Sequence, residues 1–213
     1  MELYFSPLAC SMATRIALNE AGHSATFREV DPKTKRVLAD DSDFLAIHPL
    51  GLVPTLRTDD GDILTENAAI LQYVAARCPE AGLGAASEPE RARLQQWLCF
   101  IGTELHKSLF VPLLDRSAPP EVAAYALKKG PSRLDYLNAH LEGREFLLDH
   151  FSVADAYLVT VLNWAIATPQ IDLAAWPNVK SYLSRLRKRP SVAAALAEEG
   201  CLFQAEQARH KAA

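Results

Sequence analysis

Apolar positions in the first third of the chain recur with two different periods. Short apolar runs at residues 2–5 and 26–30 predict buried strands. Between them, the apolar spacing over residues 11–21 predicts an amphipathic helix that ends at Gly22. The order is a β-α-β unit, which implies a parallel pair of strands.

A second pattern follows a polar stretch. Short strands are expected at residues 53–57 and 62–64, on either side of the turn Asp59-Asp60-Gly61, and a helix at residues 65–76. A β-α-β unit followed by β-β-α within about 80 residues is the thioredoxin-like arrangement.

The pattern changes at residues 81–88, where Gly, Ala, Ser and Glu predominate, and this stretch is predicted to be a linker. Beyond it, helical periodicity predicts helices at roughly 89–114, 120–141, 153–168, 177–188 and 191–199. The expected fold is α/β plus all-α: a thioredoxin-like domain (1–80), the linker, and a C-terminal helical bundle domain (89–213).

Composition narrows the class of protein. The 213 residues are 49% hydrophobic and 23% charged, enough to bury a core, and the net charge of −4 comes from mixed charges. No basic face is expected, so nucleic acid is not an expected partner. No run approaches the roughly 20 apolar residues that cross a bilayer, and the start does not resemble a signal peptide, so a cytoplasmic protein without a membrane association is expected.

The four cysteines, at positions 10, 78, 99 and 201, lie far apart and form no C-x-x-C pair. Their spacing fits neither a disulfide framework nor a zinc site. A reducing compartment and no bound metal are expected.

Cys10 is the first candidate for chemistry. It follows the first predicted strand, and Ser11 is a plausible N-cap, so the sulfur should lie near the positive end of a helix dipole. Such a position lowers the pKa of a thiol. The alternative is that Cys10 is a small buried core residue, and its position alone does not decide between the two.

Pro54 in the stretch from His48 to Leu56 enters a predicted strand, where proline is excluded unless it sits at an edge or its peptide bond is cis. A cis Val53–Pro54 bond would turn the Val53 backbone outward, where it can pair with an extended peptide. The alternative is a plain loop.

Two further patterns are weaker. Thr65-Glu66-Asn67 opens a helix with polar side chains and exposed N–H groups, a ready site for a carboxylate or an amino-acid head group, although many helices begin in this way. On the helix over residues 89–114, α-helical spacing places four residues on one stripe: Cys99, Thr103, His106 and Phe110. A histidine is usually a surface or core residue, but facing a thiol it becomes a proton donor or hydrogen-bond partner.

A capping box is predicted at Ser152-Val153-Ala154-Asp155, with Phe151 as a hydrophobic staple. Its role is in folding, and loss of Asp155 should cost about 1 kcal/mol or more of stability.

Taken together, these segments resemble the glutathione transferases. The resemblance rests on Ser6-Pro7-Leu8-Ala9-Cys10-Ser11, Pro49-x-Gly51-x-Val53-Pro54, Thr65-Glu66 and the capping box, and it runs essentially end to end. Cys10 together with Thr103-Glu104-Leu105-His106-Lys107 resembles the bacterial beta class.

The resemblance implies a thioredoxin-like domain that binds glutathione as co-substrate, a helical domain that forms a pocket for a small hydrophobic electrophile, and a homodimer. It implies two residues near the glutathione sulfur, Cys10 and His106. It also implies glutathione contacts at Lys35, Val53, Pro54, Glu66, Asn67, Cys99, Thr103 and Glu104, of which the last two are expected to serve the partner subunit. The pocket residues that it implies are Phe110, Leu113 and Trp164.

Three positions depart from the family pattern: Leu8 stands where Gly is common, His48 replaces the usual Asn, and Cys99 occupies a position that is often Asn. Leu8 is expected to narrow the mouth above the thiol. Cys99 places a second thiol on the predicted stripe.

Three functions remain open on the sequence. The first is conjugation, in which the thiolate of glutathione attacks an electrophilic carbon and serves detoxification. The second is monothiol thiol-disulfide exchange through a mixed disulfide of Cys10 with glutathione. The third is a glutathione transferase-like binding or regulatory protein without turnover.

Overall fold

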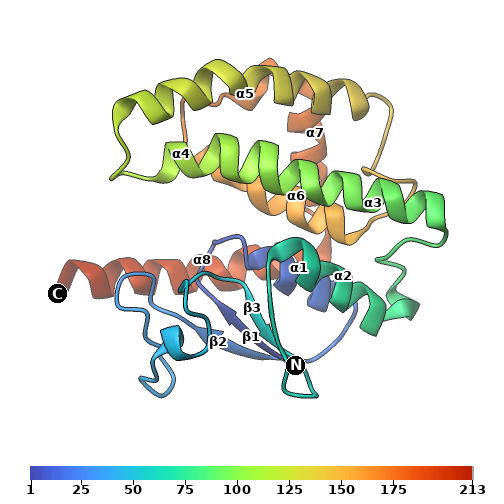
Figure 1. The fold of residues 1–213 in the computed structure, drawn as a ribbon. Helices are drawn as coiled ribbons and strands as arrows, with labels where there is room; N and C mark the ends of the chain where they lie inside the picture. The colour runs from blue at the N-terminus through green and yellow to red at the C-terminus, as the bar shows by residue number, and fades with distance from the viewer. Residues whose placement is uncertain (213) are drawn as a thin grey trace. The chain divides into compact units, whose positions relative to one another are not determined.

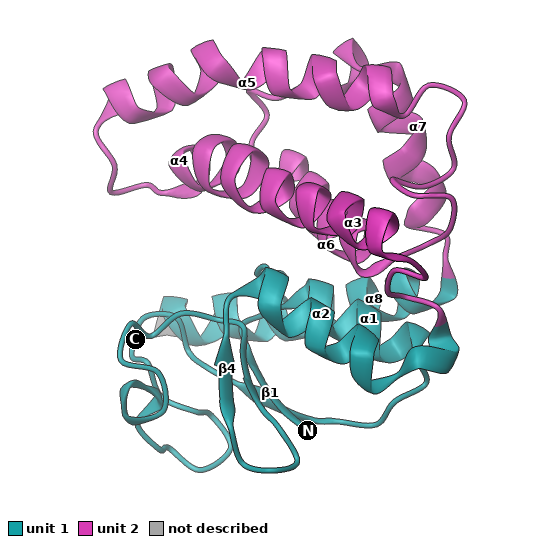
Figure 2. Ribbon diagram, turned by 45° about the vertical axis from the view of Figure 1, so that its right-hand side comes forward, with its two compact units in different colours: residues 1–81, 190–213 teal, residues 82–189 magenta. Residues whose placement is uncertain are grey.

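The computed structural model describes residues 1–212, and these form two compact units (Figure 2). Unit 1 consists of Met1–Ala81 and of the helix that begins at Pro190, and unit 2 is Gly82–Arg189. The sequence prediction placed the last helix in the helical domain, whereas it packs in unit 1. The reason is long-range: this helix lies against the first helix of the chain.

Unit 1 is built on a mixed sheet of four strands: β1 (Glu2–Phe5), β2 (Thr26–Glu29), β3 (Thr55–Arg57) and β4 (Ile63–Thr65). The strand order is β2-β1-β3-β4, with β1 and β2 parallel and the other pairs antiparallel. Leu3 at the centre of β1 pairs with Phe27 on one side and Leu56 on the other. This is the β-α-β and β-β-α order that the sequence predicts.

The helices of unit 1 are α1 (Met12–Glu20), α2 (Asn67–Arg77) and α8 (Pro190–Ala212). Two short 3-10 turns accompany them: η1 (Phe44–Ala46) between β2 and β3, and η2 (Pro79–Ala81) after α2. α1 packs against both α2 and α8 (Figure 1). Every residue from Met12 to Leu18 is buried, because α1 is covered by these two helices as well as by the sheet.

Two predicted boundaries in unit 1 shift by two residues. β3 begins at Thr55 rather than at residue 53, directly after a cis Val53–Pro54 bond. α2 begins at Asn67 rather than at residue 65, because Thr65 pairs with Thr55 in the sheet and Glu66 has a left-handed backbone (φ 67°).

Unit 2 is all-helical. One continuous run comprises α3 (Glu88–Phe100), a π-helical segment η3 (Ile101–Phe110) and α4 (Val111–Leu114). The others are α5 (Pro120–His140), α6 (Val153–Asn163) with the turn η4 (Trp164–Ile166), the turn η5 (Leu173–Ala175) and α7 (Pro177–Leu186). Every residue of α6 is buried, so α6 is the central helix of this unit.

The predicted capping box begins α6. The Asp155 carboxylate accepts hydrogen bonds from the backbone N–H and the hydroxyl of Ser152, from the N–H of Leu147 and from the hydroxyl of Tyr182. The side chain is wholly buried, so these four donors replace water around it. Through Asp155, the capping box therefore connects α6 to Tyr182 of α7 and to Leu147 in the loop that precedes α6.

Across residues 1–212, no helix is long and apolar enough to span a membrane, and no group of three or more His, Cys, Asp or Glu side chains is arranged to hold a metal ion.

Candidate functional site

The thiol of Cys10 lies where β1 passes into α1. Its Sγ is 3.1 Å from the carbonyl oxygen of Val53, to which the thiol donates. The Val53 side chain packs against the buried cluster of Tyr4, Val30, Val37 and Phe44. Because the side chain is held inward, the backbone beside the cis Pro54 bond is turned toward Cys10.

Ser11 does not cap α1 in the way that the sequence suggests. Its hydroxyl donates to the carbonyl oxygen of Ser6 (3.3 Å), and its own backbone is already helical. The Ser6 hydroxyl in turn donates to Val30 (2.7 Å). Ser11 therefore fixes the loop before Cys10 rather than the first helical N–H groups, and Cys10 remains at the N-terminal, positive end of α1.

Asn67, at the start of α2, lies beneath Cys10. Its side-chain Nδ2 donates to the carbonyl oxygen of Cys10 at 2.9 Å. Its Oδ1 is buried and accepts no hydrogen bond within the described part of the chain. The preceding Glu66 is exposed. The start of α2 thus holds the Cys10 backbone through Asn67, and the residue before it, Glu66, presents an exposed carboxylate.

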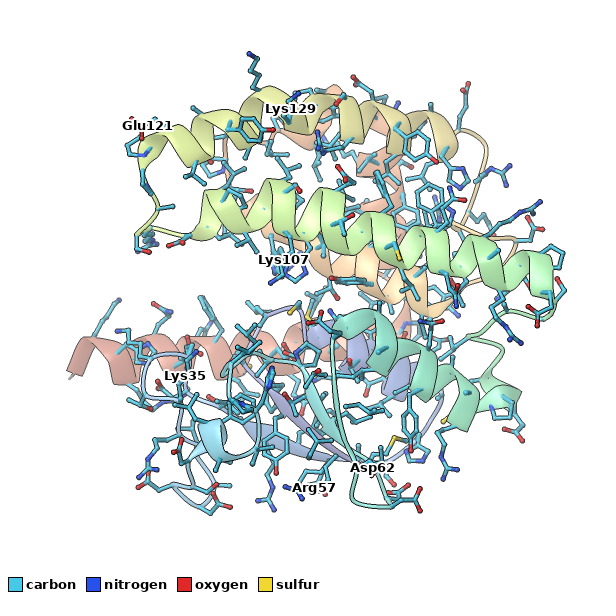
Figure 3. All side chains as sticks on the ribbon, viewed as in Figure 1. Lys35, Arg57, Asp62, Lys107, Glu121 and Lys129 are labelled. Carbon is cyan, nitrogen blue, oxygen red and sulfur yellow. The ribbon has the colours of Figure 1, made fainter. Side chains whose placement is uncertain are left out.

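Lys35 lies on the loop after β2 (Figure 3) and contacts the segment that precedes Val53. Its Nζ donates to the carbonyl oxygen of Gly51 at 3.1 Å, two residues before Val53. A Cβ on Gly51 would come within 2.9 Å of the Leu45 side chain, and its φ is +61°. Any other residue at position 51 would be strained in its backbone and would displace the Leu45 side chain, which explains the glycine in this motif.

Sequence reasoning missed a buried ion pair behind the Cys10 loop. Arg15 of α1 and Glu199 of α8 pair at 2.8 Å, and the second carboxylate oxygen of Glu199 accepts from the backbone N–H of Leu8 at 2.7 Å. Both side chains are buried, and burial raises the pKa of Glu199 to about 7 against the opposing effect of Arg15. A separation of 184 residues leaves no local signal for this pair.

Leu8 has a left-handed backbone, with φ of 58°. This conformation favours glycine, which accounts for the glycine that is common at this position in the family, and Leu8 adopts it at a cost in strain. His48, the second departure, packs edge-on against Phe44.

In unit 2, His106 is part of an aromatic cluster. Its Nδ1 lies 2.7 Å from the hydroxyl of Tyr157, and its ring packs against Trp164 at 4.9 Å between centroids. Burial first, and then the nearby charge of Lys107, lower the pKa of His106 to about 4. Near neutral pH, His106 is therefore an uncharged imidazole, able to donate or accept a hydrogen bond but not to act as a cation.

The stripe predicted on the helix over residues 89–114 divides in the structure. Cys99 and Thr103 are exposed, whereas His106 and Phe110 are buried. The reason is the π-helical segment η3, in which the repeat is longer than that of an α-helix, so α-helical spacing does not describe one face.

The other predicted residues of unit 2 lie as follows. Phe110 contacts Trp164 and is wholly buried, while Trp164 and Leu113 are partly exposed. Glu104 pairs with Arg133 at 2.7 Å, and the Thr103 hydroxyl donates to the Cys99 carbonyl oxygen. The structure thus brings His106, Phe110 and Trp164 together and keeps Cys99, Thr103 and Glu104 apart from that cluster.

Sequence profiles of two domains match the chain. The glutathione S-transferase N-terminal domain matches residues 9–77, and the glutathione S-transferase C-terminal domain matches residues 102–190. Glutathione S-transferase GstA of Escherichia coli O157:H7 is 38% identical over 202 residues, covering 94% of this chain and 99% of that protein. Glutathione S-transferase GST-4.5 of Xanthomonas campestris pv. campestris is 34% identical, again covering 94% and 99%.

Solved structures agree. The ternary complex of BphK, a bacterial GST, matches with a TM-score of 0.89 and 42% identity, covering 94% of this chain and all of that one. A bacterial beta class glutathione S-transferase from Sphingomonas chungbukensis matches with a TM-score of 0.88 and 42% identity, covering 94% and 99%. The profiles, the curated relatives and these structures together show that the chain belongs to the glutathione S-transferase family and, within it, to the bacterial beta class.

Proposed function

We propose that this protein is a glutathione transferase that conjugates glutathione to small hydrophobic electrophiles. The observation that carries the proposal is the placement of the Cys10 thiol at the start of α1, 3.1 Å from the carbonyl oxygen of Val53 in the segment that contains cis Pro54. A thiol and a turned backbone are what a cysteine-containing peptide requires from its binding site.

Unit 1 supplies groups that match the parts of glutathione. The backbone of Val53 pairs with the cysteinyl unit, the ammonium of Lys35 attracts a carboxylate, and the Glu66 carboxylate attracts the γ-glutamyl amino group. Asn67 supports Cys10 from below, since its Nδ2 already donates to the Cys10 carbonyl oxygen. A related glutathione S-transferase from a sphingomonad, 41% identical with a TM-score of 0.88, was solved in complex with glutathione, which supports this ligand.

Catalysis then requires the sulfur of glutathione to carry a negative charge. A free thiol with a pKa near 8.5 is mostly protonated near neutral pH, and the thiolate is the nucleophile. The α1 dipole favours negative charge at its N-terminus. In this proposal the Cys10 thiol exchanges its hydrogen bond to Val53 for one to the glutathione sulfur.

The electrophile is held by apolar side chains of unit 2, with Trp164 and Leu113 as the accessible members and Phe110 as buried support. The thiolate attacks the electrophilic carbon, a carbon–sulfur bond forms, and the leaving group departs with the electron pair of its bond. A homodimer in which Thr103 and Glu104 serve the partner subunit, a cytoplasmic location and a role in detoxification complete the proposal, and they rest on the family alone.

The test is an assay of the purified protein with glutathione and an aryl halide, and separately with a mixed disulfide of glutathione, for the wild type and Cys10→Ala. We expect turnover of the aryl halide by the wild type and loss of mixed-disulfide formation in Cys10→Ala, with conjugation partly retained. Conjugation in neither protein, with reduction of the mixed disulfide by the wild type, would favour the thiol-disulfide function. No turnover in either assay would leave a binding protein.

A further inference from the structure

The last turns of α8 contact the loop that follows β2. His210 Nε2 lies 2.8 Å from Oδ2 of Asp31, and one residue earlier the Arg209 guanidinium pairs with Glu29. The side chains of His210 and Asp31 are 15% and 8% exposed, so this contact is largely shielded from water. Because a carboxylate oxygen only accepts, Nε2 of His210 carries the proton in this hydrogen bond.

Asp31 divides its two oxygens between two tasks. Oδ1 accepts the backbone N–H groups of Lys33 and Thr34, both at 2.9 Å, and Oδ2 accepts from His210. Its backbone N–H donates to Arg36 at 2.9 Å, and its carbonyl oxygen accepts from Lys35 at 3.0 Å. Burial opposes ionisation of Asp31, but these donors, Thr34 and His210 foremost, lower its pKa to about 2.

The turn that Asp31 organises is the one that carries Lys35. The Lys35 backbone is left-handed, with φ of 58°, a conformation that surrounding contacts must hold. Its carbonyl oxygen accepts from Phe44 at 3.0 Å, and its Nζ donates to Gly51 at 3.1 Å. A series of direct contacts therefore runs from the end of α8 through Asp31 to Lys35 and the segment before Val53.

We propose that His210 is a positioning residue for glutathione binding, acting through Asp31 on the turn that carries Lys35. The inference rests on the proposed function, since Lys35 is the cation assigned to a glutathione carboxylate. His210 itself does not touch the ligand. Its hydrogen bond orients the Asp31 carboxylate, so that Oδ1 meets the N–H groups of Lys33 and Thr34 and the left-handed conformation of Lys35 persists.

The neighbouring charges supply a matched control. Glu206, Arg209 and Lys211 lie on the same two turns of α8, and Glu29 lies on the facing strand. Lys211 is exposed, so Lys211→Ala removes a positive charge beside the contact without removing the donor to Asp31. His210→Gln keeps an N–H donor at a similar reach, whereas His210→Ala removes it.

The experiment measures the dissociation constant of glutathione by calorimetry, and KM and kcat with an aryl halide, for the wild type and these three variants. We expect His210→Ala to raise the dissociation constant and the KM for glutathione about fivefold, a part of what one hydrogen bond to a charged group contributes. The value of kcat at saturating glutathione and the KM for the aryl halide should stay unchanged. His210→Gln should recover most of the loss, and Lys211→Ala should match the wild type.

A second measurement does not depend on the ligand. In the protein without glutathione, amide hydrogen exchange at Lys33, Thr34 and Lys35 should be faster in His210→Ala than in the wild type or in His210→Gln. Unchanged affinity and unchanged exchange in His210→Ala would overturn the inference, as would an equal loss of affinity in Lys211→Ala. A wild type that binds no glutathione would instead overturn the proposed function and with it the role of His210 in binding.

Discussion

The two units hold their candidate residues by different means. In unit 1, Cys10, Val53 and Lys35 are positioned by hydrogen bonds to backbone carbonyls and by loops with left-handed residues. In unit 2, His106 and Trp164 are positioned by ring packing inside a helical core. Backbone-built sites leave motifs of Gly, Pro and small polar residues in a sequence, whereas packed aromatic clusters leave little beyond apolar character.

The comparison is sharpest at two buried carboxylates, one in each unit. Glu199 joins α8 to α1 and to the Cys10 loop, and Asp155 joins α6 to α7. Each carboxylate is wholly buried and accepts hydrogen bonds from several donors. Removing either side chain therefore leaves buried donors without an acceptor.

Glu199→Ala should have the largest effect on stability, because it leaves the Arg15 guanidinium in the interior without its buried partner. We expect a loss of about 4 kcal/mol in the free energy of unfolding, measured by urea denaturation. Glu199→Gln, whose single amide oxygen can still accept from either Arg15 or Leu8 but not from both, should lose less. Equal losses in the two variants would show that the charge, and not the hydrogen bonding, is what the interior requires.

Asp155→Ala should follow. Four donors lose their acceptor, yet none of them is charged, so we expect a loss of about 3 kcal/mol, more than a surface capping box contributes. Tyr182→Phe removes one of the four donors and should cost about 1 kcal/mol. A loss below about 1 kcal/mol in Asp155→Ala would mean that water replaces the carboxylate at the start of α6.

His106 should make stability depend on pH. Its pKa falls from 6.5 to about 4 on folding, so the unfolded chain binds a proton first as pH decreases. The contribution of His106 is therefore complete above about pH 6.5 and is lost as pH falls toward 4. Glu199, with its pKa raised to about 7, has the opposite slope over part of this range, so the wild-type curve alone is not diagnostic.

The measurement is the difference in unfolding free energy between the wild type and His106→Gln at several pH values. The advantage of the wild type should shrink as pH falls from 6.5 toward 4. Tyr157→Phe, which removes the hydroxyl beside Nδ1, serves as a second variant in which His106 can still titrate. A difference that is constant across the range would contradict an uncharged His106.

Much of unit 1 could be predicted from the sequence. The short apolar runs indicate the strands, and a proline that enters a strand at Pro54 indicates a cis Val53–Pro54 bond. The π-helical segment η3 could not be predicted from the sequence. The apolar pattern was interpreted with the repeat of an α-helix, and η3 has a longer repeat. Arg15, Glu199, Tyr157 and His210 were missed for another reason. Their roles depend on partners far along the chain, and an apolar pattern does not identify such partners.

Leu8→Gly should have the smallest effect. Glycine relieves the strain of the left-handed backbone, which stabilises the folded state by about 1 kcal/mol. It also increases the conformational entropy of the unfolded chain, which lowers the free energy of unfolding by a similar amount. We expect a change in unfolding free energy of less than about 1 kcal/mol. Alkylation of Cys10 by iodoacetamide should become faster if Leu8 narrows access to the thiol, and an unchanged rate would remove that role.

The central claim is that this protein binds glutathione and stabilises its thiolate. The most direct test is titration of the ultraviolet thiolate absorbance of glutathione bound to Cys10→Ala, in which the protein thiol at the site no longer contributes to the signal. The account predicts that the bound sulfur ionises at least about one pH unit below a free thiol, whose pKa is near 8.5. Bound glutathione that titrates like the free tripeptide would contradict it.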